Sequence, residues 1–370
     1  MEKGKTVIFF DEVQKCPSLI TAIKFLVDKG SYFYILNGAI CEIELKDIAS
    51  IPVGYLHTKE MYPLDFEEFI TSNEITKDII KEVEKCYNTK TSVDSFIHEK
   101  MMELYNLYLL IGGMPESVKT YLECNNIEKV REVQIDILSQ YKKEIEQKDI
   151  KHKKHIEDIF SLIQKELNGK TKRFMFKDIN KDFKFSRYEN SFNFLKEANI
   201  AIPAFNVEKP TYPLKLSELK NLFKLFSSDV GLLSSIYSKD LDDEILKNNV
   251  NLNYGSLYEN AVAQELRAHG FDLYYFCDKK QGELDFVIEH EKEILPIQVK
   301  IGKDYKRHNA LKIILSDSFY NINKAIVFYN GTLKTKGVIT YLPIYMTMFI
   351  HKKKNKSLIY KIDLGPLGAK

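Results

Sequence analysis

Short apolar runs and polar segments alternate at the start of the chain. Residues 6–10 (TVIFF) and 31–36 (SYFYIL) are continuous apolar runs, and the pattern at 18–29 between them is helical. Continuous runs of this kind favour strands that are buried on both faces, as in a parallel sheet. The order strand, helix, strand therefore predicts a β-α-β unit.

Helical periodicity dominates the part of the chain that follows. Residues 74–86, 94–110 and most of 116–168 repeat their apolar positions with a helical period. The sequence Gly112-Gly113-Met114-Pro115 interrupts this pattern, and proline suits the first turn of a new helix. We expect residues 73–168 to form a helical lid.

The composition changes near residue 169. Residues 174–200 show two short helical patterns, and a β-return around 213–226 follows them. Two helices followed by a β-hairpin are typical of a winged helix. We therefore predict a winged-helix-like module over residues 169–240, in which 186–198 would be the recognition helix.

A third pattern begins near residue 250 and predicts an α/β domain over residues 250–370. It consists of an amphipathic helix, three successive strands, a second helix and a further strand. The expected ranges are 256–269 for the first helix, 272–276, 283–288 and 293–300 for the strands, 305–316 for the second helix and 323–329 for the last strand.

Polar residues with catalytic potential gather in this last domain. If Glu291-Lys292 forms the hairpin turn, Asp285 lies opposite Gln298, and Lys300 shares a face with Gln298. Oxygen-bearing side chains whose Cβ atoms are about 5 Å apart can hold one Mg²⁺ ion. A neighbouring lysine can stabilise charge on a phosphate. The pattern predicts a metal site for phosphodiester hydrolysis.

A solvated hairpin that carries a few charges is the alternative interpretation of these residues. Against it, Asp285 and Lys300 belong to otherwise apolar strands (LDFVI and ILPIQV), where charges are costly unless they have a function. Glu259 adds a carboxylate on the preceding predicted helix. We therefore take Glu259, Asp285, Gln298 and Lys300 as candidate catalytic residues.

A resemblance to a known family covers nearly all of the chain. It rests on FFDEVQ, YILNGA, YPLDFEEF and LLIGGMPESV, and further along on GSLYENAVAQELRAHGFDLYYF, QGELDFVIEHEKEILPIQVK and YLPIYM. These segments resemble a prokaryotic family of AAA-type ATPases whose C-terminal domain is similar to PD-(D/E)xK restriction-endonuclease-like folds. By this resemblance, Glu259, Asp285, position 298 and Lys300 are the nuclease-motif positions.

The resemblance also implies roles for three residues near the N-terminus. Asp11 would hold Mg²⁺ as the Walker B acid, Glu12 would polarise the attacking water, and Asn37 would be a sensor-like polar residue. Mg²⁺ and ATP are therefore the expected cofactors. ATP is expected only if a phosphate-binding loop is also present.

The chain departs from the family pattern at several positions. Gln298 replaces the expected acidic residue, which removes a negative charge and lowers the expected metal affinity. Gly4-Lys5-Thr6 runs straight into a strand, whereas a phosphate-binding loop follows a strand and opens a helix. Tyr55 and Ala39 replace an arginine and a serine. We expect an N-terminally incomplete chain with a weakened nucleotide site.

Composition excludes several classes of protein. Lys and Arg total 54 against 52 Asp and Glu, which excludes a strongly basic nucleic-acid coat but permits a local basic surface. Such a surface is predicted at Lys303, Lys306 and Arg307, beside the hairpin. Five widely spaced cysteines, no membrane-length apolar run and no signal-peptide pattern predict a cytoplasmic protein.

The predicted fold class is α/β, with a partial AAA-type parallel sheet over residues 1–72 ahead of the three parts above. The main hypothesis is an AAA-type ATP-binding protein with a nuclease-like C-terminal domain that acts on nucleic acid. The alternative is a non-catalytic DNA- or protein-binding module with degenerate ATPase and nuclease sites.

Nucleic acid is the expected partner, a protein partner or a homo-oligomer is a further option, and no membrane association is expected. No arginine finger can be assigned, and Arg131 is only a candidate.

Overall fold

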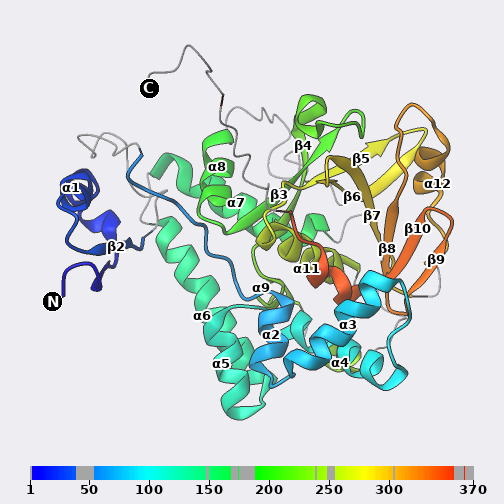
Figure 1. The fold of residues 1–370 in the computed structure, drawn as a ribbon, viewed down its shortest axis with the longest axis horizontal. Coiled ribbons are helices and arrows are strands. Elements are labelled where there is room, and N and C mark those ends of the chain that lie inside the picture. The colour runs from blue at the N-terminus through cyan, green and yellow to red at the C-terminus, as the bar shows by residue number, and fades with distance from the viewer. Residues whose placement is uncertain are drawn as a thin grey trace.

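The computed structural model describes residues 2–38, 54–146, 150–167, 174, 188–237, 240–247, 255–302, 305–353 and 362. Their strands form one two-stranded sheet near the N-terminus and one eight-stranded sheet in the C-terminal half. Figure 1 shows the larger sheet with helices packed below and beside it, and the smaller sheet set apart from it.

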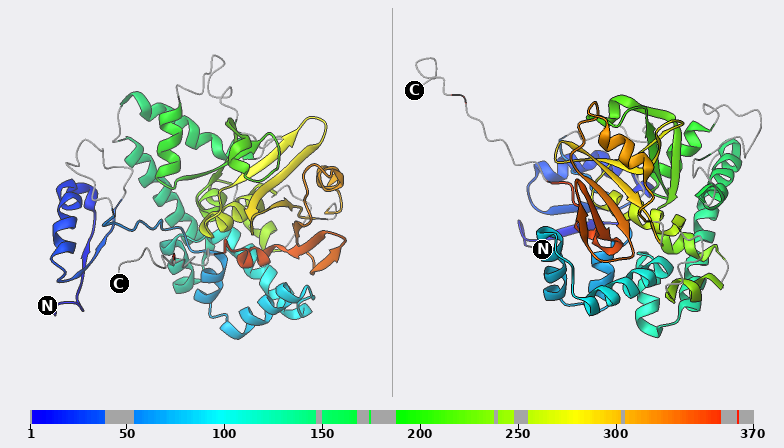
Figure 2. Two further views of the ribbon diagram at one scale, coloured as in Figure 1. Left: turned by 45° about the horizontal axis from the view of Figure 1, so that its top comes forward. Right: turned by 90° about the vertical axis from the view of Figure 1, so that its right-hand side faces the viewer.

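The N-terminal unit has the predicted β-α-β order. Strand β1 (Val7–Phe10) is followed by helix α1 (Pro17–Asp28) and strand β2 (Phe33–Leu36). The two strands pair in parallel, with Val7 opposite Phe33, so the predicted parallel pairing is confirmed. In Figure 2 an extended segment joins this unit to the rest of the molecule.

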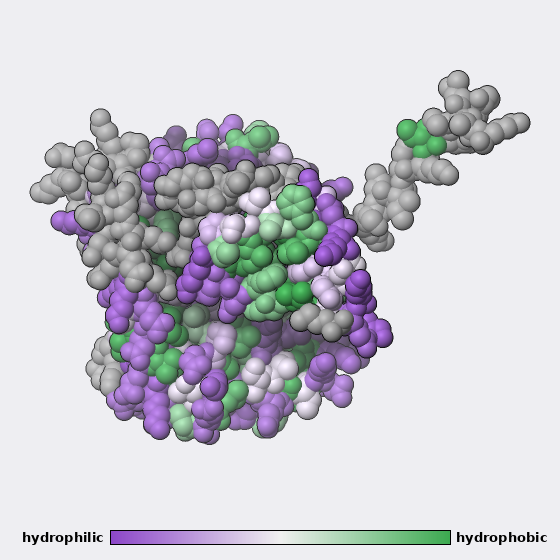
Figure 3. Space-filling view, turned by 90° about the vertical axis from the view of Figure 1, so that its left-hand side faces the viewer, coloured by the Kyte–Doolittle hydropathy of each residue, from purple (hydrophilic) through white to green (hydrophobic). Residues whose placement is uncertain are grey.

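One face of the small sheet is exposed and apolar. Val7, Phe9, Phe33 and Ile35 are between 50% and 61% exposed, so the prediction that both faces are buried is wrong for these residues. The side chains alternate between an exposed and a half-buried face along each strand, as a pleated strand dictates. Figure 3, viewed from the side on which this unit lies, shows a hydrophobic patch bordered by hydrophilic residues.

Six helices follow, in agreement with the helical periodicity of this part of the chain. They are α2 (Phe66–Ser72), α3 (Lys77–Thr89), α4 (Ser95–Ile111), α5 (Pro115–Cys124), α6 (Ile127–Glu146) and α7 (Ile150–Leu167). Asp65 caps α2 through a capping box with Glu68, which satisfies two backbone donors of the first turn. Pro115 is the first residue of α5, as predicted.

The eight-stranded sheet has the order β4-β3-β5-β6-β7-β8-β10-β9. Its strands are β3 (Ala201–Val207), β4 (Glu218–Ser227), β5 (Tyr274–Asp278), β6 (Gly282–His290), β7 (Glu293–Val299), β8 (Ala325–Tyr329), β9 (Lys334–Lys336) and β10 (Ile339–Pro343). Because β3 pairs in parallel with β5, the hairpin predicted as a wing lies in the same sheet as the predicted C-terminal domain.

The predicted recognition helix at 186–198 corresponds to α8 (Glu189–Glu197). The other short helix predicted for this module, KDINKD at residues 177–182, lies outside the described residues. Two short helices, α9 (Val230–Ser235) and α10 (Asp240–Leu246), then lead towards the C-terminal part. Helix α8 therefore lies beside the sheet, where the ring of Phe192 contacts the ring of Phe223 on β4.

The two faces of the large sheet pack against different elements. One face shares a hydrophobic core with α11 (Gly255–Ala268) and with the 3₁₀ helix Ile344–Phe349, and the other face packs on α12 (Asn309–Ser316). Along β6, Phe286 joins the first core and Val287 the second. This alternation places successive side chains on opposite faces.

The helices predicted as a lid share their core with the C-terminal half. Phe69, Tyr105 and Tyr108 belong to the same buried cluster as Tyr258 and Tyr345. Ile20 and Ile23 of α1 are buried but lie outside both large clusters of described residues. In the described part of the chain, these helices therefore pack on the C-terminal sheet rather than on the N-terminal strands.

Candidate functional site

The hairpin of β6 and β7 has the register predicted from the sequence. Phe286 lies opposite Ile297 and His290 opposite Glu293. The turn residues Glu291 and Lys292 have φ values of 57° and 65°, the left-handed values that a two-residue hairpin turn requires. The sequence therefore located both the turn and the strand pairing correctly.

Asp285 and Lys300 are brought together at the end of this hairpin. The Oδ2 atom of Asp285 accepts a hydrogen bond from the backbone N–H of Val299 at 2.8 Å and lies 3.4 Å from Nζ of Lys300. Gln298 is buried, and its side-chain N–H donates to the backbone carbonyl of Glu283 at 2.8 Å. The predicted acid and lysine are thus neighbours, and the amide is fixed beside them.

Lys224, which sequence reasoning did not select, is the cation at the centre of this cluster. It projects from β4, has no exposed surface, and its Nζ lies 2.6 Å from Oε1 of Glu283. Burial opposes the charge of Lys224, but Glu259, Glu283 and Asp285 raise the pKa of this lysine above its usual value. A charged residue inside the apolar run LFKLF was the signal for it.

The charges of this carboxylate cluster (Glu259, Glu283 and Asp285 with Lys224 and Lys300) nearly balance. Three carboxylates face two ammonium groups, and Gln298 contributes no charge. A divalent cation prefers oxygen ligands with net negative charge. Because Lys224 already compensates part of that charge, Mg²⁺ fits this set less well than it would fit the carboxylates alone.

Exposed lysines lie beside the carboxylate cluster. Burial lowers the pKa of His308, and the charges of Lys312, Lys300 and Lys336 lower it further. Lys334 donates to the hydroxyl of Tyr305 at 2.8 Å, and the charges of Lys334 and Lys306 lower the pKa of Tyr305. We call Lys300, Lys306, Lys312, Lys334 and Lys336 the basic face. Of the residues predicted for a basic surface, Lys306 belongs to it, Arg307 is exposed next to it, and Lys303 lies outside the described residues.

The acidic pair near the N-terminus sits where the two parallel strands end. Oδ1 of Asp11 accepts hydrogen bonds from the side-chain N–H of Asn37 at 2.7 Å and from the backbone N–H of Glu12 at 3.0 Å. Glu12 adopts a left-handed backbone, and its carboxylate lies 3.0 Å from Nζ of Lys15. The structure therefore joins Asp11 to Asn37, as expected for side chains at the carboxyl ends of adjacent parallel strands.

Residues 4–6 have the geometry that the sequence predicts for them. Gly4 has a φ of 75°, its N–H donates to the carbonyl of Ser31 at 2.8 Å, and β1 begins at Val7. The segment therefore opens a strand and not a helix. Nζ of Lys24 on α1 lies over the ring of Tyr55, 5.6 Å from its centroid, and Ala39 lies outside the described residues.

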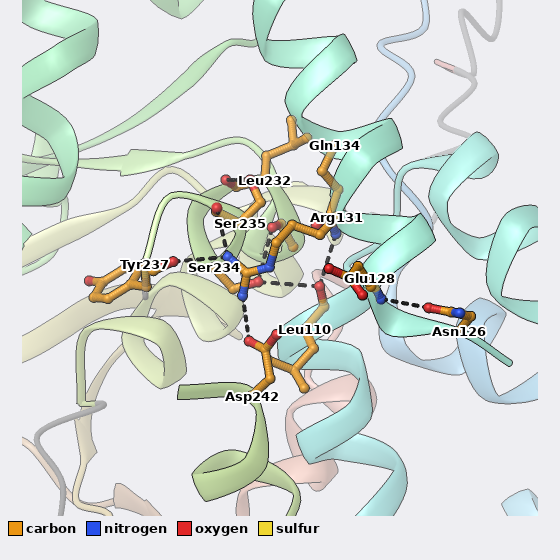
Figure 4. Close-up of polar contacts among 11 residues, drawn as sticks. Leu110, Asn126, Glu128, Arg131, Gln134, Leu232, Ser234, Ser235, Tyr237 and Asp242 are labelled. Atoms are coloured by element: carbon orange, nitrogen blue, oxygen red, sulfur yellow. Dashed lines mark hydrogen bonds and ion pairs between the residues drawn. The ribbon is translucent and has the colours of Figure 1, made fainter. Parts of the chain in front are cut away.

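Arg131 is buried inside the helical region (Figure 4). Its Nη1 donates to the carbonyls of Ser235 and Tyr237 at 2.8 and 2.9 Å, and Nη2 contacts Asp242 at 2.5 Å. All of these partners belong to the segment around α9 and α10. In this structure Arg131 joins α6 to that segment instead of projecting outward as an arginine finger would.

Three family models match separate parts of the chain. Residues 1–70 match an AAA domain, residues 102–243 match a Domain of unknown function (DUF8612), and residues 254–346 match a Domain of unknown function (DUF4143). Comparisons with curated proteins and with solved structures found no match. In the described residues, no helix combines the length and apolarity that a membrane crossing needs.

The matches support an AAA-type ATPase family for this chain. At the level of that family, the AAA domain implies ATP and Mg²⁺ as ligands. The mixed α/β architecture agrees with the predicted fold class.

Proposed function

We propose that the chain is an AAA-type ATP-binding protein whose C-terminal sheet binds nucleic acid at a nuclease-like site. The observation that carries this proposal is the position of Lys300. It lies 3.4 Å from the buried carboxylate of Asp285, and its charge also acts on His308 within the basic face. A single side chain thus links a motif typical of phosphodiester chemistry to a surface suited to phosphates.

The basic face has the composition of a nucleic-acid surface. Lys306, Lys312, Lys334 and Lys336 are exposed, and cations on a surface bind phosphates by displacing counterions. Lys334 lies over the rings of Tyr305, Tyr329 and Tyr341 at 4.3 to 5.6 Å from their centroids, which keeps its ammonium group in place. Binding of this type should weaken steeply as salt rises.

For the N-terminal site, we propose that Asp11 and Asn37 contribute to Mg²⁺–ATP binding. Asp11 is exposed and positioned by Asn37, and exposed carboxylate oxygens are suitable Mg²⁺ ligands. When bound, Mg²⁺ would neutralise phosphate charge. Glu12, beside Asp11, is the residue that would orient a water molecule.

A non-catalytic binding module is the second candidate function, and Lys224 favours it. Nuclease chemistry at this hairpin would need Mg²⁺ held by Asp285 and the Gln298 amide, with Lys300 near the scissile phosphate. The neutral Gln298 and the buried ammonium of Lys224 both reduce the local negative charge. Cleavage is therefore expected to be weak or absent while nucleic-acid binding remains.

The first experiment measures DNA binding and cleavage by the full chain. The double variant Lys306→Ala/Lys336→Ala should weaken DNA binding about tenfold, because two phosphate contacts are lost. Lys81→Ala/Lys85→Ala is the matched control, since both lysines are exposed on α3. Equal binding by the wild type and both variants would refute the proposed surface.

Cleavage of plasmid and single-stranded DNA with Mg²⁺ or Mn²⁺ separates the two candidates. Activity that disappears in Asp285→Ala would identify a nuclease. Activity gained in Gln298→Glu would show that the missing carboxylate had weakened the site. No cleavage by any variant, with salt-sensitive binding intact, would establish the binding module.

A further inference from the structure

A second cluster of ionisable side chains shares no residue with either site described above. Asp65 is the N-cap of α2, Glu265 lies in the last turn of α11, and His269 directly follows that helix, four residues after Glu265. Nε2 of His269 is 3.7 Å from Oδ2 of Asp65 and 3.7 Å from Oε1 of Glu265. One atom from each residue therefore faces a common point, and all three lie within 4.8 Å of one another.

Each of the three side chains is oriented by a backbone group through its other polar atom. Nδ1 of His269 lies 2.7 Å from the carbonyl oxygen of Ile350, Oε2 of Glu265 accepts from the N–H of Phe66 at 3.0 Å, and Oδ1 of Asp65 accepts from the N–H of Glu68 at 2.9 Å. Because the Ile350 carbonyl can only accept, Nδ1 of His269 carries the proton of the neutral imidazole, and Nε2 of that form offers its lone pair. Proteins orient metal ligands through hydrogen bonds of this kind to the atoms that do not face the metal.

Glu265 is buried, and no lysine or arginine of the described residues is paired with this cluster. Glu265 is 2% exposed, and its Oε1 has no hydrogen-bond partner among the described residues. A buried carboxylate oxygen without a partner is costly. Arg267, on the same helix, pairs instead with Glu60 and Asp272. His269 can supply a positive charge only by protonation, and its ring lies 4.1 Å from that of His351.

We propose that Asp65, Glu265 and His269 form a binding site for a divalent transition metal, with Zn²⁺ as the best fit. Zn²⁺ binds carboxylate oxygen and imidazole nitrogen at about 2.0–2.2 Å, usually with tetrahedral geometry. Tetrahedral ligands at that distance are about 3.4 Å apart, so the 3.7 Å separations close with shifts of a few tenths of an ångström. Two carboxylates and a neutral imidazole also cancel the charge of the ion.

Asp65 is partly exposed and gives the site contact with solvent. Asp65 borders a surface cavity of about 390 Å³ that is also lined by Glu67, Glu68 and Thr71. A water molecule from this side can complete the coordination. The metal would join the segment that begins α2 to α11 and so hold the YPLDFEEF segment on the C-terminal half. This inference does not depend on the proposed function.

The test is metal binding to the full chain after treatment with a chelator. We expect one equivalent of Zn²⁺ by calorimetry and elemental analysis, a visible Co²⁺ spectrum of tetrahedral type, and a metal-dependent rise in melting temperature. His269→Ala and Glu265→Gln should each weaken Zn²⁺ binding about 100-fold or more, because one of three protein ligands is lost. Glu265→Gln keeps an acceptor for the Phe66 N–H, which protects the fold.

The matched control is His98→Ala. His98 is half-buried and contacts the hydroxyl of Tyr345 at 3.0 Å, so its loss should leave Zn²⁺ affinity unchanged. Circular dichroism checks that every variant is folded. The proposal is overturned if the wild type takes up no stoichiometric Zn²⁺, or if folded Glu265→Gln and His269→Ala bind Zn²⁺ as tightly as the wild type. Excess Mg²⁺ should not displace the ion, which separates this site from the Mg²⁺ sites considered above.

Discussion

Lys224 is a lysine with no exposed surface in the middle of β4. Removing an ammonium group from water is expensive, and only nearby opposite charges can offset that cost. The three carboxylates of the cluster supply those charges, which is why they raise the pKa of Lys224. The same lysine that stabilises the cluster also competes with any divalent cation for it. One residue thereby affects both the fold and the chemistry of the hairpin.

Replacement of Lys224 by methionine should therefore destabilise the protein. The change keeps the volume of the side chain but leaves buried carboxylates without their cation, and it should lower the free energy of unfolding by about 3–5 kcal/mol. Denaturant unfolding at neutral pH measures the loss. Lys220→Met, at an exposed position on the same strand, should cost less than about 0.5 kcal/mol. Equal effects of the two substitutions would contradict the role of Lys224.

At the scale of elements, the break between α4 and α5 is fixed by one buried aspartate. Asp229 accepts hydrogen bonds from the N–H of Gly113 at 2.6 Å, from the N–H of Leu232 at 2.9 Å and from the side chain of Gln264 at 3.2 Å. Gly112 has a φ of 70°, and a Cβ there would come within 2.1 Å of the Asp229 carboxylate. Glycine is required at this point because α4, α9 and α11 meet there.

Gly112→Ala should accordingly be strongly destabilising. It combines the penalty for a left-handed backbone with a clash against a carboxylate held by several hydrogen bonds, and we expect a loss of about 3 kcal/mol or more in the free energy of unfolding. Gly270→Ala is the control, because Gly270 also has a positive φ but no atom within 4 Å of its added Cβ. It should cost only about 1–2 kcal/mol. The difference between the two melting curves measures the clash together with the greater backbone strain at Gly112, whose ψ is −164°.

At the scale of the whole molecule, the helical region and the C-terminal sheet share one hydrophobic core. Phe69 on α2, Tyr108 on α4, and Leu257 on α11 are all completely buried in the same cluster. The N-terminal unit has its own small interior at Val13, Ile20 and Ile23. The chain therefore divides by packing into an N-terminal unit and a larger body, whatever boundaries the sequence patterns indicate.

Hydrogen exchange of two core variants tests this division. Phe69→Ala should lower the stability of the body by about 3–5 kcal/mol and increase exchange in α11 and β6 as well as in α4. Ile23→Ala should increase exchange within residues 7–36 and leave the body unchanged. If Phe69→Ala affected only the helices α2–α6, the shared core would not be a cooperative unit.

Much of the local structure follows from the sequence. The helices, the β-hairpin with its Glu291-Lys292 turn and the parallel β-α-β unit are all encoded by short-range periodicity and turn preference. Asp11 and Asn37 were also predictable neighbours, because adjacent parallel strands end at the same edge of a sheet. Each of these inferences needs only contacts between residues close in sequence or between consecutive strands.

Tertiary structure alone decided the features that join distant segments. The hairpin of β3 and β4 extends the C-terminal sheet, which brings Lys224 to Glu283. Asp65 lies close to Glu265 and His269 although about 200 residues separate them in the sequence. The spacing of Glu265 and His269 on one predicted helix was visible in the sequence, but their proximity to Asp65 was not. The physical reason is that periodicity records which face of an element is buried, whereas the identity of the opposite surface depends on how all the elements pack together.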